Sequence, residues 1–399
     1  MAKASHPYQI FAKPIGSICN LSCDYCYYLR KQSLYPDEKS FPMPEDILEE
    51  YILQHIEACP DPVIHFSWHG GEPTLLGLEY FRNLVALQRK HRPPDRRIIN
   101  GIQTNGTLID EEWCRFLAAE GFGVGISLDG PQEMHDSHRL TKGGQPTHTQ
   151  ALRGYELLRK HRIPCDVLCV VHAQNVLHPR EVYHFFKQIK AASIGFLPLV
   201  EPRADLDEGV SSATVPSESF GTFLCTVFDE WTSQDIGQVR IQIFEETAAT
   251  ALGQEHTLCI FKKTCGDVPV IEHNGDFFAC DHFVNREHHL GNIRETRLVD
   301  LIESPAQRAF GQLKRDTLPR YCLECDVLNL CNGGCPKDRI LRAPDGKAGL
   351  NYLCAGYKRF FTHCRPFLGE LTALRQPPTR PVKPTQAYPQ IGRNDPCPC

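Results

Sequence analysis

Three cysteines near the start of the chain have a spacing that suits a metal centre. Cys19, Cys23 and Cys26 form the pattern C-x3-C-x2-C. Three thiolates on one compact loop can hold three irons of a cubane [4Fe–4S] cluster, whose usual complement is four cysteines. The fourth iron is then open, and an open position distinguishes a catalytic metal site from a structural one. A zinc knuckle or a set of buried thiols is the alternative for this pattern taken alone.

Eight further cysteines lie in the second half of the chain. Eight thiolates divide into two fully ligated sites of four. Spacing alone leaves open whether these are iron–sulfur clusters or structural zinc sites. The eight are Cys259, Cys265, Cys280, Cys322, Cys325, Cys331, Cys335 and Cys354. Outside the tail, the remaining cysteines are expected as free thiols, mostly in the core: Cys59, Cys114, Cys165, Cys169, Cys225 and Cys364.

The elements that must position the first cysteines form a repeating order. Short apolar runs alternate with amphipathic stretches, which predicts parallel β/α units. Asp110 is a candidate N-cap and Pro44 a candidate first-turn proline. The expected strands are 9–15, 63–68, 97–103, 122–128, 165–171 and 193–200. The expected helices are 45–58, 78–91, 110–120, 149–161, 180–191 and 217–232.

These six units predict an α/β fold, a partial (β/α)6 TIM-like barrel, because a closed barrel has eight. Such a sheet presents its chemistry at the carboxyl ends of its strands. The motifs 69–73, 104–106 and 129–130 follow the second, third and fourth strands. From about Val239 the alternation stops, and we expect a loop-rich segment held by metal ligation. The predicted domains are 1–235, the barrel; 236–375, a cluster-binding domain; and 376–399, a proline-rich tail.

The composition excludes several classes of function. Hydrophobic residues make up 41% and charged residues 23% of the 399 residues, which is typical of a soluble globular protein. The net charge of −5 gives no reason to expect a nucleic-acid partner. No segment approaches the ~20 apolar residues that span a bilayer, and the N-terminus lacks an apolar signal region. We therefore expect a cytoplasmic protein without a membrane partner, in which clustered cysteines are metal ligands rather than disulfides.

Together with Gly70-Gly71-Glu72-Pro73, the first cysteine loop resembles the radical S-adenosylmethionine enzymes. The resemblance implies that the three cysteines bind a [4Fe–4S] cluster whose open iron is chelated by the methionine part of S-adenosylmethionine. A guanidinium fork suits a carboxylate, which makes Arg139 a reasonable cofactor contact, with a surface salt bridge as the equal alternative. The implied contacts are Gly70 at the methionine part, Tyr25 near the adenine, Ser127 and Arg139 at the ribose and carboxylate end, and the backbone near Val200.

The later cysteines resemble the auxiliary-cluster region of the SPASM subgroup of these enzymes. This implies two further [4Fe–4S] clusters, three in all. Full ligation leaves neither auxiliary cluster an open iron, so both are expected to store or relay electrons. The resemblance assigns Cys259, Cys265, Cys280 and Cys335 to the first auxiliary cluster, and Cys322, Cys325, Cys331 and Cys354 to the second. The placement of Cys335 comes from the resemblance and not from its spacing.

Over residues 8–374 the chain is similar to the anaerobic sulfatase-maturating enzymes. The specific segments are 19–28, 70–73, 103–106, 127–130 and 280–284. The resemblance implies oxidation of a Ser or Cys to Cα-formylglycine in an unfolded sulfatase polypeptide with a Cys/Ser-x-Pro-x-Arg motif. It also implies an electron donor such as flavodoxin or ferredoxin. Two alternatives remain: another SPASM enzyme that forms a thioether or carbon–carbon crosslink in a peptide, and a non-enzymatic zinc-binding scaffold.

The implied reaction needs a base beside the target residue. A 5′-deoxyadenosyl radical takes a hydrogen from the target β-carbon, the base removes a proton, and an auxiliary cluster accepts the second electron. Asp281 is the candidate base because it directly follows Cys280; capping its own loop is the alternative. Tyr28 and Gln103 are expected at the same mouth as substrate contacts, with packing or structural hydrogen bonds as the alternative.

The C-terminal Cys397-Pro398-Cys399 departs from this family pattern. Residues 392–399 resemble the opening half of a small zinc motif that also ends the secretion ATPase. Two thiolates cannot complete a tetrahedral zinc site. A truncated motif, a vestigial tail and a partner-binding appendage all stay open.

Overall fold

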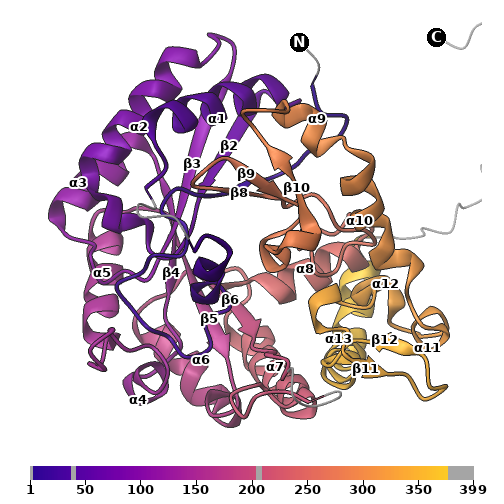
Figure 1. The fold of residues 1–399 in the computed structure, drawn as a ribbon. Helices are drawn as coiled ribbons and strands as arrows, with labels where there is room; N and C mark the ends of the chain where they lie inside the picture. Colours follow the sequence, from indigo (N-terminus) through magenta and orange to yellow (C-terminus); the bar gives the residue numbers. More distant parts are fainter. Residues whose placement is uncertain (1–2, 37–41, 204–208, 376–399) are drawn as a thin grey trace, which may run out of the picture.

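A ten-stranded sheet runs through the computed structural model, which describes residues 3–36, 42–203 and 209–375 (Figure 1). Its strands lie in the order β10-β9-β8-β1-β2-β3-β4-β5-β6-β7. From β8 through β7 neighbouring strands pair in parallel, as β/α units require. The bounds are β1 Phe11–Lys13, β2 Val63–Trp68, β3 Arg97–Thr104, β4 Gly123–Ser127, β5 Cys165–Val171, β6 Ser193–Pro198, β7 Arg240–Ile241, β8 Val270–Glu272, β9 Asp276–Phe278 and β10 His289–Asn292.

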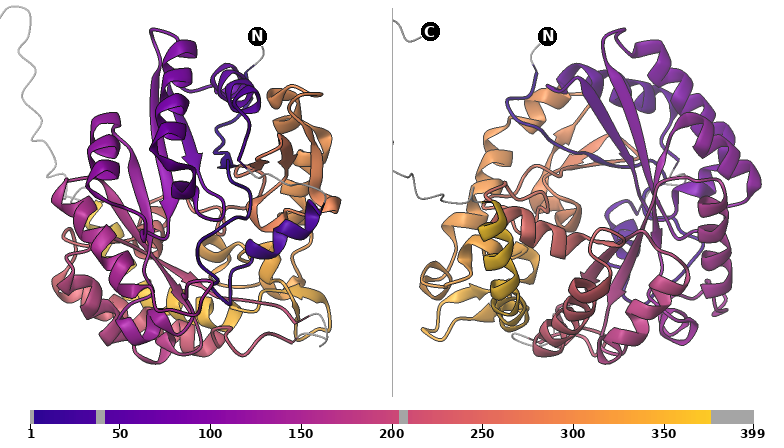
Figure 2. Two further views of the ribbon diagram at one scale, coloured as in Figure 1. Left: turned by 60° about the vertical axis from the view of Figure 1, so that its left-hand side comes forward. Right: turned by 180° about the vertical axis from the view of Figure 1, so that it is seen from behind.

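Helices cover the convex face of this curved sheet, and the concave face stays open toward the first cysteine loop (Figures 1 and 2). The edge strands β7 and β10 do not pair with each other, so the described sheet is an incomplete barrel. The helices of the barrel are α1 Glu45–Ala58, α2 Gly77–His91, α3 Glu111–Glu120, α4 Gln132–Asp136, α5 His148–Lys160, α6 Pro179–Gln188 and α7 Ser217–Gln234.

The expected β/α units all form, and α1, β2 and β5 have the predicted bounds. Asp110 caps α3, because its Oδ1 accepts hydrogen bonds of 2.9 Å from the backbone N–H groups of Glu112 and Trp113. Pro44 lies at the N-cap of α1 rather than in its first turn. The first strand is shorter than predicted, since the chain turns at Gly16, which has a φ of +56°.

The C-terminal region has more regular structure than the sequence predicts. Strand β8 pairs with β1 and continues the barrel sheet, while α13 packs along α7 of the barrel. Phe261 and Phe360 belong to the same hydrophobic core as the barrel residues, so apolar burial as well as metal ligation can hold this region. The division near residue 235 stays a prediction. The elements are α8 Gln242–Ala251, α9 Leu298–Ile302, α10 Pro305–Asp316, α11 Arg320–Leu323, α12 Leu328–Cys331, α13 Cys354–Arg375, β11 Leu341–Arg342 and β12 Ala348–Leu350.

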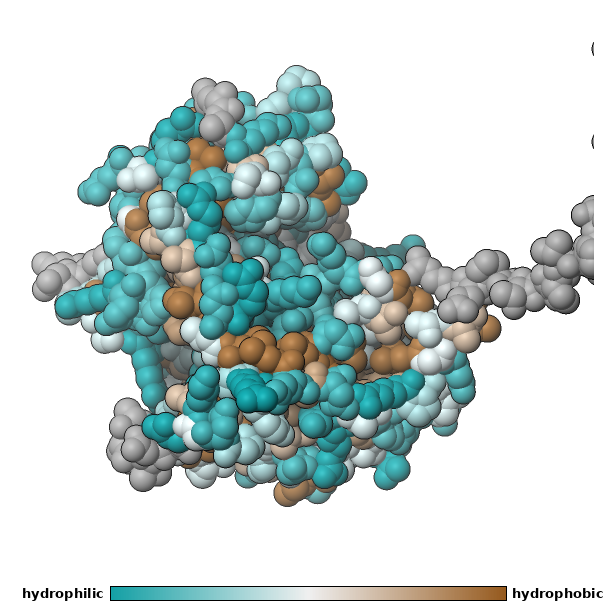
Figure 3. Space-filling view, turned by 90° about the vertical axis from the view of Figure 1, so that its right-hand side faces the viewer, coloured by the Kyte–Doolittle hydropathy of each residue, from teal (hydrophilic) through white to brown (hydrophobic). Residues whose placement is uncertain are grey.

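The face of the C-terminal region exposes a band of apolar side chains (Figure 3). Leu313 on α10 is 56% exposed, and Leu323 on α11 is 59% exposed. Within the described part of the chain, no helix combines the length and apolar character needed to cross a membrane. The tail cysteines Cys397 and Cys399, with the predicted domain 376–399, lie outside the described residues.

Candidate active site

The first cysteine loop packs against the loop that follows β2. The N–H of Gly71 donates to the carbonyl of Gly16 at 2.7 Å, and the N–H of Glu72 donates to that of Ile18 at 2.8 Å. A Cβ on Gly71 would lie 2.0 Å from the Ile18 carbonyl oxygen. Only glycine therefore allows the two loops to approach so closely.

We expect Gly71→Ala to disrupt the first cluster site. The added methyl group must push the cysteine loop away, and a displacement of about 1 Å can cost about 100-fold in rate. Formation of 5′-deoxyadenosine by the reconstituted enzyme should fall by at least this factor, with a loss of about four irons. Gly123→Ala on β4 is the matched control, since a Cβ there meets no atom within 4 Å. Equal iron content and cofactor cleavage in the two variants would contradict this expectation.

Buried polar groups tie the cysteine loop to the loop after β3. The Glu72 carboxylate accepts hydrogen bonds from the Asn105 N–H and the Thr104 hydroxyl, both at 2.7 Å. Burial raises the pKa of Glu72, while these hydrogen bonds act in the opposite direction. Asn105 Nδ2 donates to Asn20 Oδ1 at 2.9 Å and lies 3.8 Å from Cys19 Sγ. Asn105 thus links the second and third strand loops to a candidate cluster ligand.

The three cysteines of this loop lie close together beside a large cavity. Cys23 and Cys26 line this cavity, which has a volume of about 510 Å³. Burial raises the pKa of Cys19 to about 11 and that of Cys23 to about 12, and the neighbouring cysteines contribute. The Cys19 and Cys23 thiols must therefore release a proton when they bind a metal centre.

Arg139 lines the same cavity but is already paired to a carboxylate. Its Nε and Nη2 donate to Asp129 at 2.7 and 3.2 Å, and the Tyr25 hydroxyl also donates to Asp129. Asp129 is fully buried, and although burial alone would raise its pKa, Arg139 holds that pKa below its usual value. The pair is therefore a buried ion pair rather than one on the surface, and the cofactor role of Arg139 stays a prediction. The sequence marked the 129–130 motif after the fourth strand, but it did not predict that Asp129 pairs with Arg139.

Only some of the other predicted cofactor contacts line this cavity. Val200 and Tyr25 line it, whereas Gly70 and Ser127 are not among its lining residues. Gln103 Nε2 donates to Ser127 Oγ at 3.3 Å, across a position where a Cβ on Gly125 would meet Gln103 Oε1 at 2.0 Å. The bare backbone of Gly125 lets the Gln103 amide lie along the sheet, so both alternatives for Gln103 stay open.

Asp281 lies in a network with residues from the first strand and the cysteine loop. Its Oδ1 is 2.6 Å from Lys13 Nζ, and its Oδ2 accepts a hydrogen bond from the Tyr27 hydroxyl. The Asp281 side chain is 13% exposed and that of Lys13 is 3% exposed. Burial by itself would raise the pKa of Asp281, but Lys13 and His282 outweigh it and hold the pKa well below its usual value. The buried Lys13 was missed; its only signal was a charge inside an apolar run.

Tyr27, and not Tyr28, faces the cavity. Tyr27 lines it and is 44% exposed, whereas Tyr28 is 3% exposed. The Tyr28 hydroxyl donates to Glu272 at 2.6 Å, and the ring lies 4.4 Å from Lys13 Nζ. The expectation that Tyr28 points into the mouth is therefore corrected, because its hydroxyl turns inward to Glu272 on β8.

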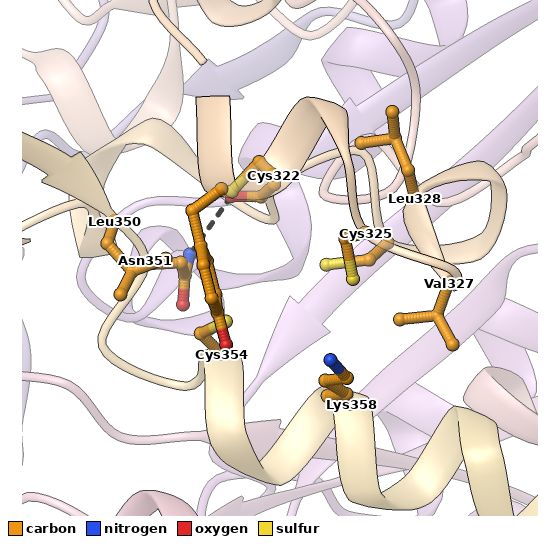
Figure 4. Close-up of a pocket in the computed structure, with 11 residues that line it drawn as sticks. Cys322, Cys325, Val327, Leu328, Leu350, Asn351, Cys354 and Lys358 are labelled. Atoms are coloured by element: carbon orange, nitrogen blue, oxygen red, sulfur yellow. Dashed lines mark hydrogen bonds between the residues drawn. The ribbon is translucent and has the colours of Figure 1, made fainter. Parts of the chain in front are cut away.

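The eight later cysteines line two separate cavities. One, of about 30 Å³, is lined by Cys259, Cys265, Cys280 and Cys335. The other, of about 20 Å³, is lined by Cys322, Cys325, Cys331 and Cys354, with the first turn of α13 supplying Cys354 (Figure 4). Among the described residues, no three His, Cys, Asp or Glu side chains converge on a point where one metal ion could sit. The cysteines instead surround spaces, grouped as the resemblance implies.

The first of these cysteine cavities is adjacent to the large cavity. His282 lines both of them. Pro336 lines the cysteine cavity, while the next residue, Lys337, lines the large cavity. Asp281 and His282 follow Cys280 directly in the chain, and of these two residues only His282 is among the lining residues of both cavities.

Comparisons with known proteins agree with this geometry. Residues 14–186 match the model of the Radical SAM superfamily, and residues 264–326 match that of the SPASM iron–sulfur cluster-binding domain. A serine-type anaerobic sulfatase-maturating enzyme of Bacteroides thetaiotaomicron is 42% identical over 92% of each chain. The chain belongs to the anaerobic sulfatase-maturating enzymes. A cysteine-type enzyme of Clostridium perfringens is 33% identical over 91% of this chain and 97% of its own.

Solved structures show that the fold of this chain is also similar to that of known proteins. Native anSMEcpe with bound AdoMet and Cp18Cys peptide matches with a TM-score of 0.84 at 32% identity, over 93% of this chain and 100% of that one. Streptococcus suis SuiB bound to precursor peptide SuiA matches with a TM-score of 0.59 at 19% identity, over 88% of this chain and 76% of its own, which shows the fold alone. These findings confirm the partial barrel with a C-terminal SPASM domain.

Membership of the family also confirms the class of chemistry. An anaerobic sulfatase-maturating enzyme is a radical S-adenosylmethionine oxidoreductase that forms Cα-formylglycine, with iron–sulfur clusters and S-adenosylmethionine as cofactors. The zinc-scaffold alternative is thereby excluded. The donor sets fit these cofactors, because Cys23 and Cys26 of the incomplete set of three line the large cavity, and two complete sets of four line two smaller ones. The individual roles of the residues stay predictions.

Proposed function

We propose that this chain oxidises a serine or cysteine within a Cys/Ser-x-Pro-x-Arg segment of an unfolded sulfatase polypeptide. The observation that carries the proposal is the large cavity, which is lined by Cys23 and Cys26 on one side and by His282, next to Asp281, on another. A target side chain in this cavity can meet both the hydrogen-abstracting cofactor and the candidate base. The SPASM relatives that form crosslinks in peptides share the cluster motifs but not the family identity.

Serine is the proposed preferred target. Serine-type relatives are 42%, 37% and 36% identical to this chain, and cysteine-type relatives are 33%, 33% and 31% identical. Cysteine is the second candidate, since those relatives also cover about nine-tenths of the chain. A reducing cytoplasm and a low-potential donor such as flavodoxin or ferredoxin complete the proposal.

The chain itself would hold the cofactors through its cysteines and Arg139. When bound, a cluster on Cys19, Cys23 and Cys26 with S-adenosylmethionine supplies a 5′-deoxyadenosyl radical that takes one hydrogen atom from the target β-carbon. Arg139, fixed by Asp129, keeps Nη1 to orient the cofactor carboxylate.

Asp281 would accept the second hydrogen of the target as a proton. Lys13 and Tyr27 fix its carboxylate from two sides, so a target hydroxyl or thiol meets an oriented acceptor. Cys259, Cys265, Cys280 and Cys335 would hold an auxiliary cluster beside His282, and this cluster would supply the acceptor for the remaining electron. Serine thereby loses two hydrogens and gives the aldehyde directly. Cysteine gives a thioaldehyde, which water hydrolyses to the same aldehyde with release of sulfide.

The test uses anaerobically reconstituted full-length enzyme with reductant, S-adenosylmethionine and two peptides, one with each version of the motif. We expect the serine peptide to lose two mass units, with 5′-deoxyadenosine formed in step. The cysteine peptide should react more slowly to the same aldehyde. Release of 5′-deoxyadenosine with both peptides unchanged would contradict the proposed substrate and favour a different peptide modification.

A further inference from the structure

The large cavity has an uneven charge distribution. Four cationic side chains line it: Arg30, Lys31, Arg139 and Lys337. Among the described residues of its lining, Glu201 carries the single carboxylate. Arg139 is neutralised by Asp129, and Lys337 pairs with Asp338. The Glu201 carboxylate is thus the one group in this lining that can attract a positively charged part of a ligand.

Glu201 already holds a guanidinium in this structure. Arg30 Nη2 lies 2.9 Å from Glu201 Oε1, so the pair joins the 3-10 helix Leu29–Leu34 to the segment after β6. The Arg30 side chain is 74% exposed and that of Glu201 is 24% exposed. An exposed ion pair of this kind contributes little to stability, so another guanidinium can replace Arg30 without much loss.

The backbone of Glu201 is anchored by two hydrogen bonds. Its N–H donates to Thr214 Oγ1 at 3.0 Å, and its carbonyl accepts from the Ser211 N–H at 2.9 Å. A carboxylate on a fixed backbone, with an exposed and exchangeable arginine on it, has the features of a binding subsite. Planar carboxylates and guanidinium groups match each other through two parallel hydrogen bonds, which lysine cannot form.

We propose that Glu201 binds the arginine side chain of the peptide substrate, and that Arg30 occupies this subsite in the free enzyme. The inference rests on the proposed function, in which the substrate motif carries an arginine four residues after the target. Four residues of extended chain span up to about 14 Å. Glu201 and the cysteine loop line the same cavity, so one peptide can engage both. Binding then requires the peptide arginine to displace Arg30.

The experiment compares two serine peptides that differ in one side chain, arginine or its neutral isostere citrulline. Binding to reconstituted full-length enzyme with S-adenosylmethionine and no reductant is measured by fluorescence anisotropy, and KM and kcat are measured after reduction. We expect wild type to bind the arginine peptide at least about tenfold more tightly, as a charge-assisted hydrogen bond allows. Glu201→Gln should abolish this preference, raise KM for the arginine peptide and leave kcat nearly unchanged.

Two further variants separate this subsite from its alternatives. Arg30→Gln should tighten binding of the arginine peptide, because the competing guanidinium is gone. Glu218→Gln breaks a similar exposed pair with Arg359 on α7 and α13 and should leave the preference intact. Weaker binding in Arg30→Gln, or an unchanged preference for arginine in Glu201→Gln, would overturn the subsite.

The same data keep the two proposals apart. Oxidation of both peptides by wild type without preference for arginine would overturn the subsite and leave the function standing. Preferential binding without oxidation would support the subsite and contradict the function. Failure of wild type to bind the arginine peptide would overturn both.

Discussion

Asp281→Asn should lower the rate of peptide oxidation by about 100-fold or more while leaving 5′-deoxyadenosine formation within a few-fold of wild type. The magnitude is that of a general base, which contributes about 10²–10⁴-fold. Asparagine keeps the shape of the side chain but cannot take up the proton of the target hydroxyl. Hydrogen abstraction needs only the first cluster and its cofactor, and the partners of the Asp281 carboxylate among the described residues are Lys13 and Tyr27 rather than the three cysteines. The two products, oxidised peptide and 5′-deoxyadenosine, are measured in the same reaction.

Two control variants test whether the loss of activity in Asp281→Asn comes from a disturbed structure rather than from the missing base. Tyr27→Phe removes the hydrogen bond to Asp281 but leaves the Asp281 carboxylate in place. We therefore expect a smaller loss of peptide oxidation than in Asp281→Asn. Asp276→Asn on β9 changes a carboxylate that is hydrogen-bonded to Asn274 and Asn292, and it should oxidise peptide normally. Iron content and thermal unfolding are compared for all variants. Full peptide oxidation by Asp281→Asn would remove this residue from the mechanism.

Alanine at Cys335 should remove the same cluster as alanine at Cys265. Each single variant is expected to lose about four of about twelve irons, because three thiolates no longer complete the site. The double variant Cys265→Ala with Cys335→Ala should lose no more iron than either single change. Cys335→Ala combined with Cys354→Ala should lose about eight, because these residues line different cavities. Iron and sulfide analysis of the reconstituted proteins gives the result.

Electron paramagnetic resonance of the reduced proteins provides a second readout if three thiolates retain a cluster. In that case Cys335→Ala and Cys265→Ala should alter the same signal, and Cys354→Ala a different one. Cys114→Ala, at a fully buried thiol on α3, is the control and should keep all the iron. If Cys335→Ala and Cys354→Ala removed the same iron or altered the same signal, the assignment of Cys335 to the first auxiliary cluster would be contradicted.

Local patterns in the sequence predicted the barrel and the first cluster loop well. Hydrophobic periodicity and capping depend on residues a few positions apart, which is why α1, β2 and β5 have the predicted bounds. The first cysteines lie within eight residues of each other, so their association needs no long-range information. Periodicity was less informative after Val239, where β8 joins the barrel sheet beside β1, although 256 residues separate the ends of these strands.

Only the tertiary structure decided how the site is completed, because its decisive contacts join distant segments. Tyr27 and Tyr28 are adjacent, yet one hydroxyl reaches Asp281 and the other Glu272, and no local rule distinguishes them. Asp281 compensates the charge of the buried Lys13, although 267 residues lie between them in the chain. In the same way the fold brings Cys335 to the cavity of Cys280, and Glu201 to Arg30. Residue types and spacing therefore determined the kind of chemistry, while long-range packing determined which side chains lie in the candidate active site.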